Sequence, residues 1–125
     1  MQGTSARAGD PVASVATPAL VIDLDAMERN LEAMAAFARS HGIRLRPHAK
    51  MHKSAALAKA QIAAGAVGVC VQKLSEAEVL ADAGIADIYI SNEVIDAAKL
   101  ARVAALAARI TLAIAVDSIL GVDRL

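Results

Sequence analysis

The chain has 125 residues and a mass of 12.8 kDa, the size of a single domain. Hydrophobic residues make up 57% of it, but Phe37 and Tyr89 are its only aromatic residues. Thirteen Lys and Arg residues balance thirteen Asp and Glu residues, so the formal net charge is zero. A neutral chain with so few aromatic rings offers neither a basic surface for phosphates nor a platform for base stacking, and we expect no nucleic-acid partner.

Cysteine content and hydropathy bear on the compartment. Cys70 is the single cysteine, so no disulfide can form within the chain. The sequence contains no run of about 18–20 apolar residues, the length that a membrane span requires. The first residues also lack the continuous apolar stretch of a signal peptide. We therefore expect a cytoplasmic protein without a membrane partner, in which residues 1–17 form a flexible leader and residues 18–125 form the domain.

After the leader, short apolar runs alternate with helical patterns. The first run predicts a strand over 19–22. A helix follows, because Asp25 and Glu28 have the spacing of a capping box and Gly42 is a typical helix terminator. Its apolar face is formed by Met27, Leu31 and Met34.

The same alternation continues along the chain. A strand is predicted over 43–48, then a helix between Ser54, a good N-cap residue, and Gly65. The next strand covers 67–72. Ser75 and Glu78 form a capping box that opens another helix, which ends at Gly84. The remaining elements are a strand over 87–91, a helix over 95–108, a strand over 111–116, and the start of a helix capped by Asp117 or Ser118.

The spacing of the strands indicates their topology. Their carboxyl ends fall near Lys50, Gln72, Ser91 and Asp117, at steps of about 20–25 residues, which is typical of βα units in a parallel sheet. The fold class is therefore α/β, either an open doubly wound sheet or a closed (β/α)8 barrel. Neither glycine-rich phosphate motif, GxGxxG or GxxxxGK[ST], is present.

In both architectures the active site lies at the carboxyl ends of the strands, so polar residues there are candidates. The segment 44–53 is rich in basic residues, and strand alternation places Arg46, His48 and Lys50 on one face. A lysine among other cations has its neutral form favoured, and a neutral amine can attack a carbonyl to form a Schiff base. The alternative is a solvated basic strand edge without a catalytic role.

The other strand ends carry further polar residues. Gln72 ends one predicted strand, Ser91 ends the next and is followed by Asn92 and Glu93, and Asp117 follows the last. Singly, each is a common helix cap or loop residue. Together they supply amide donors and acceptors around one rim, which suits a polar planar ring.

Four segments carry a resemblance to a known family: TPALVIDLD, RPHAKMHKS, GVCVQKLSEAE and ISNEV. The chain resembles, from Thr17 to about Asp117, the N-terminal part of the D-threonine aldolase and D-serine dehydratase-like family. These are pyridoxal-phosphate enzymes of fold type III. The resemblance implies a parallel (β/α) barrel of the alanine racemase N-terminal type, present here as an incomplete barrel of about four βα units.

The resemblance also implies roles for single residues. Lys50 of the RPHAK segment matches the lysine that binds pyridoxal phosphate covalently. His48 beside it, Gln72 and Asn92 match positions that face this cofactor. His52 is implied as a catalytic acid/base or substrate-side residue.

The implied activity is a carbon–carbon lyase that cleaves β-hydroxy-D-amino acids to glycine and an aldehyde. The alternatives are a D-serine or D-3-hydroxyaspartate dehydratase, a non-catalytic pyridoxal-phosphate-binding homeostasis protein, and an interaction fragment that completes a partner's barrel. The family commonly forms homodimers and uses a divalent cation, manganese or zinc. We expect the ligands of that cation, the phosphate-binding loops and the remaining strands to lie outside this chain, and the 125-residue chain alone to be poorly stable and inactive.

Overall fold

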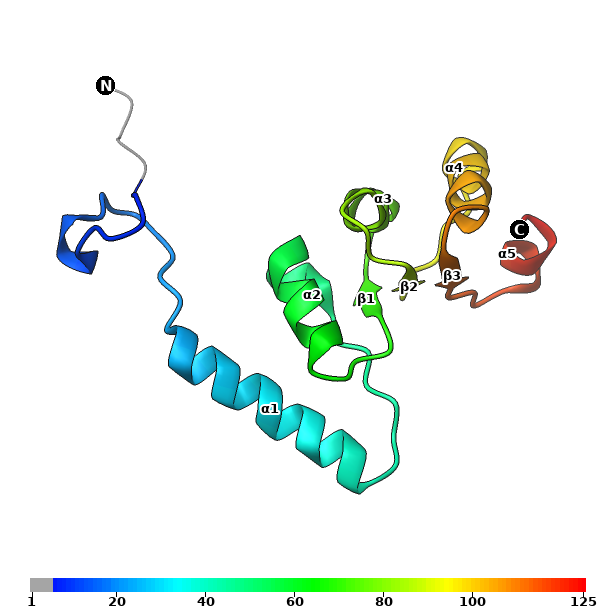
Figure 1. Cartoon of the computed structure of the whole chain (residues 1–125). Coiled ribbons are helices and arrows are strands. Elements are labelled where there is room, and N and C mark those ends of the chain that lie inside the picture. The colour runs from blue at the N-terminus through cyan, green and yellow to red at the C-terminus, as the bar shows by residue number, and fades with distance from the viewer. Residues whose placement is uncertain (1–5) are drawn as a thin grey trace.

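The computed structural model describes residues 6–125 (Figure 1). Three parallel strands form its sheet, and five α-helices and two short 3-10 helices, η1 and η2, make up the other elements. In chain order they are η1 (Val12–Ser14), α1 (Leu24–Ser40), η2 (Ala49–Met51), α2 (Ala55–Ala63), β1 (Val69–Val71), α3 (Leu74–Asp82), β2 (Asp87–Ile90), α4 (Ala97–Ala107), β3 (Thr111–Ile114) and α5 (Ile119–Asp123).

The sheet confirms the predicted α/β class. Its strands lie in the order β1-β2-β3, all parallel, with α3 joining the first pair and α4 the second. The register pairs Cys70 with Tyr89, and Tyr89 with Ala113. Both connecting helices lie on the same side of the sheet (Figure 1), as the βα units of a barrel require. The sheet is part of such a barrel.

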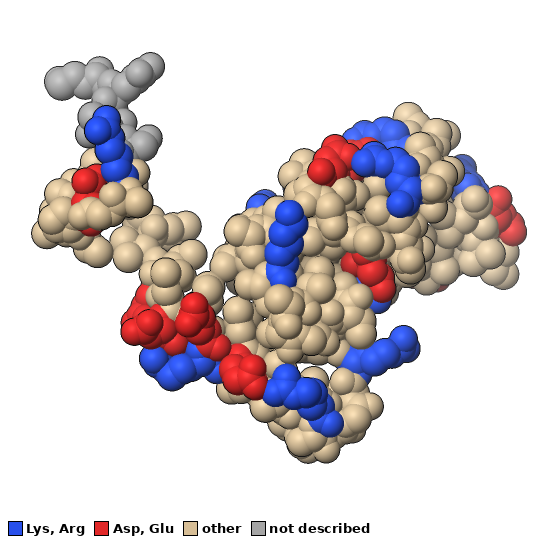
Figure 2. Space-filling view, in the orientation of Figure 1, with Lys and Arg blue, Asp and Glu red and all other residues tan. Residues whose placement is uncertain are grey.

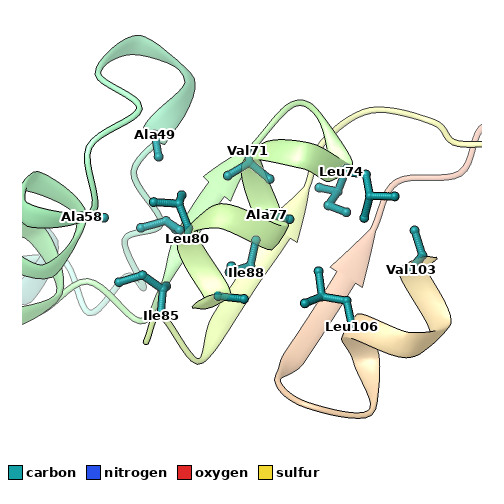
Figure 3. Packing of buried hydrophobic residues seen from close by; sticks show 13 residues of the cluster. Ala49, Ala58, Val71, Leu74, Ala77, Leu80, Ile85, Ile88, Val103 and Leu106 are labelled. Atoms are coloured by element: carbon teal, nitrogen blue, oxygen red, sulfur yellow. The ribbon is translucent and has the colours of Figure 1, made fainter. Parts of the chain in front are cut away.

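The hydrophobic core lies between this sheet and its two helices (Figure 3). Alternate strand residues point into it, and Val69, Val71, Ile88 and Ile90 are completely buried. The helices contribute small and aliphatic side chains, which allow close approach to the sheet. The further members of the cluster are Ala49, Ala58, Leu74, Ala77, Leu80, Ala81, Ile85, Val103 and Leu106.

The intervening strand residues point to the opposite face of the sheet, away from α3 and α4. Cys70 and Tyr89 lie on this face together with Thr111 and Ala113, and the last two are exposed. In a closed barrel this face is the interior. The polar residues predicted to form the site therefore lie at the carboxyl edge of this face.

Two predicted strands differ from the structure. Residues 19–22 form no strand, and Leu20 is fully exposed, because no described strand lies beside this segment. The segment 43–48 runs parallel to β1 but pairs as a strand only through the bridge between His48 and Cys70. Pro47 has no N–H to donate, although its carbonyl accepts from the N–H of Cys70 at 2.8 Å.

Two predicted helix starts also shift. The N-cap of α1 is Asp23, whose carboxylate accepts from the N–H of Ala26, in place of the expected Asp25. The predicted box of Ser75 and Glu78 is wrong as well, because α3 begins at Leu74, and Glu76 bonds the backbone at its start. The helix caps predicted at Ser54 and Ser118 are confirmed: Ser54 accepts from the N–H of Leu57, and Ser118 from the N–H of Gly121.

Helix α1 projects from the rest of the chain (Figure 1). Its predicted apolar face borders an open groove whose other wall contains Leu45 and Pro47, so Met34 remains half exposed. Acidic and basic side chains lie side by side along this helix, whereas much of the remaining visible surface is uncharged (Figure 2). Among residues 6–125, no helix has both the length and the apolarity needed to cross a membrane.

Candidate functional site at the carboxyl edge of the sheet

Lys50 lies in η2, immediately beyond the bridge between His48 and Cys70. The predicted placement of Lys50 on a strand face with Arg46 and His48 is therefore wrong: the chain leaves the sheet at His48, where the predicted strand ends, and turns. The turn is closed by the N–H groups of His52 and Lys53, which both donate to the carbonyl of Ala49. It buries Ala49 against the core and leaves the side chain of Lys50 exposed.

His48 supports this turn from within the sheet. Its Nδ1 atom accepts a hydrogen bond from the backbone N–H of Lys50 (3.3 Å), and its Nε2 atom lies 3.3 Å from the hydroxyl oxygen of Ser91. That hydroxyl donates to the carbonyl oxygen of Val71 (3.1 Å). Burial lowers the pKa of His48, the charge of Lys50 lowers it further, and Glu76 acts in the opposite direction.

His52 supports the turn from the other side. Its Nδ1 atom accepts from the backbone N–H of Ser54 (3.0 Å), and its Nε2 atom lies 3.3 Å from Oε1 of Gln61 in α2. Both ring nitrogens are thus within hydrogen-bonding distance of groups in the chain. An acid/base role for His52 requires its ring to leave Gln61.

Lys53 and Glu76 link the turn to α3. Lys53 has a positive φ of 50°, an uncommon conformation for a residue other than glycine, and its Nζ lies 3.8 Å from Oε1 of Glu76. The other oxygen of Glu76 accepts from the backbone N–H groups of Gln72 (3.0 Å) and Lys73 (3.2 Å). Burial raises the pKa of Glu76, but these two hydrogen bonds and the charges of Lys53 and Lys73 outweigh it, so its pKa is lowered.

Arg46 also has a partner. Its Nη1 lies 2.8 Å from Oδ1 of Asp87, the first residue of β2, and both side chains are about two-thirds buried. The basic segment is therefore not a uniformly solvated edge. From Arg46 to Lys53, each basic side chain contacts a group of the chain except Lys50, which forms no ion pair within the described part of the chain.

Gln72 and Asn92 lie together at the same edge of the sheet. Each follows the end of a strand, and both line a hollow between the β1–α3 and β2–α4 connections that also contains Lys73, Glu93 and Lys99. Lys50 lies outside the lining of this hollow. The structure thus gathers the predicted residues into two neighbouring groups, His48 with Lys50 and His52, and Gln72 with Asn92.

Three contributors to the site escape a reading of the sequence. Ser91 was identified only as a strand-end residue, yet it contacts His48 from two strands away. Glu76 holds the start of α3, and its position three residues after Lys73 is the signal that identifies this role. Gly68 gives no signal in a single sequence, because its role is to leave room for the contact between Arg46 and Asp87, which lie on either side of it.

No metal centre is evident among residues 6–125, where no three His, Cys, Asp or Glu side chains gather closely enough to hold an ion. Cys70 is buried and reduced, and its thiol lies 3.9 Å from the carbonyl oxygen of Val71. Among the described residues, the groups available at this edge are the amines of Lys50, Lys73 and Lys99, the amides of Gln72 and Asn92, and the hydrogen-bonded imidazoles of His48 and His52.

Characterised proteins share this sequence over most of its length. The chain is 51% identical over 113 residues to a D-threonine aldolase from Arthrobacter sp., a match that covers 90% of this chain and 30% of the relative. It is 50% identical over 93 residues to a 3-hydroxy-D-aspartate aldolase from Paracoccus denitrificans, covering 74% and 24%. It is 49% identical over 79 residues to a D-threo-3-hydroxyaspartate dehydratase from Delftia sp., covering 63% and 21%. The chain spans less than a third of the length of these relatives.

Solved structures agree with this relationship. The D-threonine aldolase from Filomicrobium marinum superposes with a TM-score of 0.95 at 55% identity, over 97% of this chain and 33% of that one. The D-threo-3-hydroxyaspartate dehydratase from Delftia sp. HT23 gives a TM-score of 0.80 at 40% identity, over 89% and 29%. Residues 22–121 match the family model described as alanine racemase, N-terminal domain. The chain, a partial parallel barrel, therefore belongs to the alanine racemase N-terminal domain family.

Proposed function

We propose that this chain supplies the cofactor-binding lysine of a pyridoxal-phosphate-dependent lyase that acts on β-hydroxy-D-amino acids. The reacting group is the side-chain amine of Lys50. The domain proposed to carry it extends over residues 18–125, and the family match over 22–121 supports these bounds. The aldolase activity of relatives that are 50–51% identical supports the choice of reaction.

One observation carries the proposal. Within a strongly basic segment, the neighbours of Lys50 are engaged by Asp87, Ser91, Gln61 and Glu76, and the amine of Lys50 has no ion-pair partner among the described residues. An exposed ion pair contributes little stability, so Lys50 loses little by having none. Its unpaired amine, on a turn that its neighbours fix, is free to form a covalent bond.

The residues present fit pyridoxal phosphate. Its aldehyde needs a primary amine, which Lys50 offers at the carboxyl edge of a parallel sheet, where such folds bind their ligands. Gln72 and Asn92 at the same edge can donate and accept hydrogen bonds toward polar ring substituents. His48 can present only the face of its imidazole, because both of its nitrogens are occupied.

When bound, the cofactor ring acts as an electron sink for the bond that breaks at the α-carbon of the amino acid. The chain's own contribution is positional. The turn of η2 holds the Lys50 backbone through Ala49 and His48, so that only the side chain must adjust as the amine reacts. A reacting group that is already fixed loses less entropy on reaching the correct geometry.

The experiment combines the protein with pyridoxal phosphate, reduces the mixture with borohydride and locates the trapped adduct by mass spectrometry. We expect the adduct on Lys50 and its loss in Lys50→Ala. The matched control is Lys59→Ala, which removes an exposed lysine from α2 and should leave trapping unchanged. An adduct that persists on another residue in Lys50→Ala would show that the lysine assignment is wrong.

Product analysis then separates the candidate reactions. With D-threonine and manganese, an aldolase yields glycine and acetaldehyde as the Cα–Cβ bond breaks. A dehydratase loses the β-hydroxyl as water and yields an α-keto acid and ammonia, as expected if the similarity to the Delftia enzyme reflects the reaction. In the full-length gene product, trapping at Lys50 without either product would support the homeostasis alternative.

A further inference from the structure

We infer that Ser91 is a positioning residue for Lys50 and acts through the imidazole of His48. This inference rests on the proposed function of Lys50, because it assigns Ser91 a role in presenting that amine. It connects three elements of the chain, since Ser91 follows β2, His48 precedes η2, and the carbonyl of Val71 ends β1.

The hydrogen bonds determine where the protons lie. The backbone N–H of Lys50 can only donate, so Nδ1 of His48, 3.3 Å away, must be the unprotonated acceptor. A neutral imidazole then carries its single proton on Nε2, which points to the hydroxyl oxygen of Ser91 at 3.3 Å. The hydroxyl proton in turn points to the carbonyl oxygen of Val71 at 3.1 Å. The relay runs in one direction, from His48 to Ser91 to Val71.

The hydroxyl of Ser91 is itself held in place. The backbone N–H of Ser91 donates to the same carbonyl of Val71 at 2.9 Å, which continues the ladder between β1 and β2 by one residue. Ser91 is therefore fixed by its main chain and offers a stationary acceptor to Nε2. The backbone N–H alone would be enough to extend the sheet, so the hydrogen bonds of the hydroxyl point to a second role for Ser91.

The consequence reaches Lys50 through the other nitrogen. By bonding Nε2, Ser91 selects the tautomer in which Nδ1 is free to accept, and it orients the ring so that Nδ1 faces the Lys50 N–H. His48 thereby acts as the N-cap of η2, the turn that carries Lys50. If the proton moved to Nδ1, two N–H donors would face each other and the cap would be lost.

The lowered pKa of His48 is consistent with this arrangement, since a neutral ring is the form that the relay requires. The charged groups that act on this ring are Lys50 in η2 and Glu76 in α3, and they act in opposite directions. Just beyond β2, the neutral hydroxyl of Ser91 faces the ring.

The test is a nuclear magnetic resonance measurement on the protein without cofactor. Long-range ¹H–¹⁵N spectra of the imidazoles report the tautomer of each histidine, and amide exchange reports the Lys50 N–H. In wild type we expect His48 as the Nε2–H tautomer. In Ser91→Ala we expect a mixture of tautomers and about tenfold faster exchange at Lys50, the change that corresponds to ~1.4 kcal/mol, near the value of one hydrogen bond. Ser91→Thr keeps a hydroxyl and should restore both signals.

A matched control is available at the end of α1. The hydroxyl of Ser40 lies 3.0 Å from Nδ1 of His41 and donates to the carbonyl of Phe37 at 2.9 Å, so like Ser91 it has one histidine nitrogen and one backbone carbonyl as partners. Ser40→Ala should leave the His48 tautomer and the Lys50 exchange rate at their wild-type values. An equal effect of both serine variants would show general loosening and would overturn the inference.

If Ser91→Ala does not fold, a pair of His48 variants tests the cap through which Ser91 is proposed to act. His48→Asn places Oδ1 near the position of Nδ1 and keeps an acceptor for the Lys50 N–H, whereas His48→Gln loses it. We expect slow exchange at Lys50 in the first and fast exchange in the second. The opposite order, or an unchanged His48 spectrum in a folded Ser91→Ala protein, overturns the inference.

The cofactor reaction separates this inference from the proposed function. Borohydride trapping at Lys50 should be about tenfold slower in Ser91→Ala than in wild type if the turn must be held for the amine to react. If wild type is never trapped at Lys50, the proposed function fails, while the tautomer and exchange results still decide whether Ser91 orders the turn. If trapping is equally fast in Ser91→Ala, its role in presenting the amine is refuted.

Discussion

The guanidinium of Arg46 reaches the carboxylate of Asp87 at 2.8 Å by passing over Gly68, the residue just before β1. The bridge of His48 to Cys70 sets the register, so that Arg46 lies beside Gly68 and Gly68 beside Asp87. Any side chain at position 68 would fill the space that the ion pair occupies. One glycine thus permits a contact between two residues that are 41 positions apart.

This arrangement predicts that Gly68→Ala is strongly destabilising. The added Cβ would overlap the backbone carbonyl oxygen of Asp87 and lie 2.6 Å from Nη1 of Arg46. Because the backbone of β2 cannot move aside as a side chain can, we expect the free energy of unfolding to fall by ~2 kcal/mol or more in urea denaturation. Gly121→Ala is the control, since its Cβ would lie 3.3 Å from the hydroxyl of Ser118, and it should cost much less. Equal losses would contradict the steric argument.

The ion pair itself predicts a measurable coupling. A double-mutant cycle with Arg46→Met and Asp87→Asn should give a coupling free energy of ~1 kcal/mol, because both side chains are largely shielded from solvent. The comparison pair is Arg109 and Asp82, whose side chains are 57% and 64% exposed and whose coupling should be close to zero. Similar couplings in the two cycles would indicate that partial burial does not strengthen the inner pair.

Local sequence patterns correctly predicted the three strands that pair with one another in the sheet. The strands around Val69, Ile88 and Leu112 combine β-branched residues with flanking glycine or polar residues, and their positions are correct to within a few residues. The segments 19–22 and 43–48 have comparable apolar patterns but are not strands, because strand formation depends on neighbours as well as on sequence. The first has no described neighbour, and the second has β1 on one side and a proline within it.

Only part of the candidate site could be predicted from the sequence. Lys50 could be selected from its basic surroundings and its place after a strand, because both are local features of the sequence. Its lack of an ion-pair partner among the described residues could not be predicted. That feature depends on Arg46 and Lys53 pairing with carboxylates on β2 and α3, which are distant in the sequence. The contact of His48 with Ser91 likewise depends on the strand register, which a single sequence does not specify.

The lowered pKa of His48 predicts how stability depends on pH. Burial and the charge of Lys50 place its folded-state pKa below the unfolded value of about 6.5, so the unfolded chain binds more protons in this range. The stabilisation from the neutral ring is therefore present above about pH 6.5 and is lost as the pH falls through the folded-state pKa. Urea unfolding at a series of pH values should show this loss in wild type.

The same series with His48→Asn should be flatter over this range, because the titrating group is gone. His41→Asn changes an exposed histidine at the end of α1 and should retain the wild-type slope. A slope that survives in His48→Asn would assign the pH dependence to another group.

Glu76 predicts a separate loss of stability at lower pH. Its carboxylate accepts from the N–H groups of Gln72 and Lys73 and faces Lys53, and its pKa lies below the ordinary 4.5. Its contribution is therefore present above that value and is lost as the pH falls through the lowered pKa. Glu76→Gln should cost ~1 kcal/mol at neutral pH, the usual cost of losing a helix cap, and should remove this acid-side transition. The control is Glu78→Gln, which breaks only a surface contact with Arg102 on α4 and should retain the acid-side transition. If Glu78→Gln lost the transition and Glu76→Gln kept it, α3 would be stabilised through its outer face.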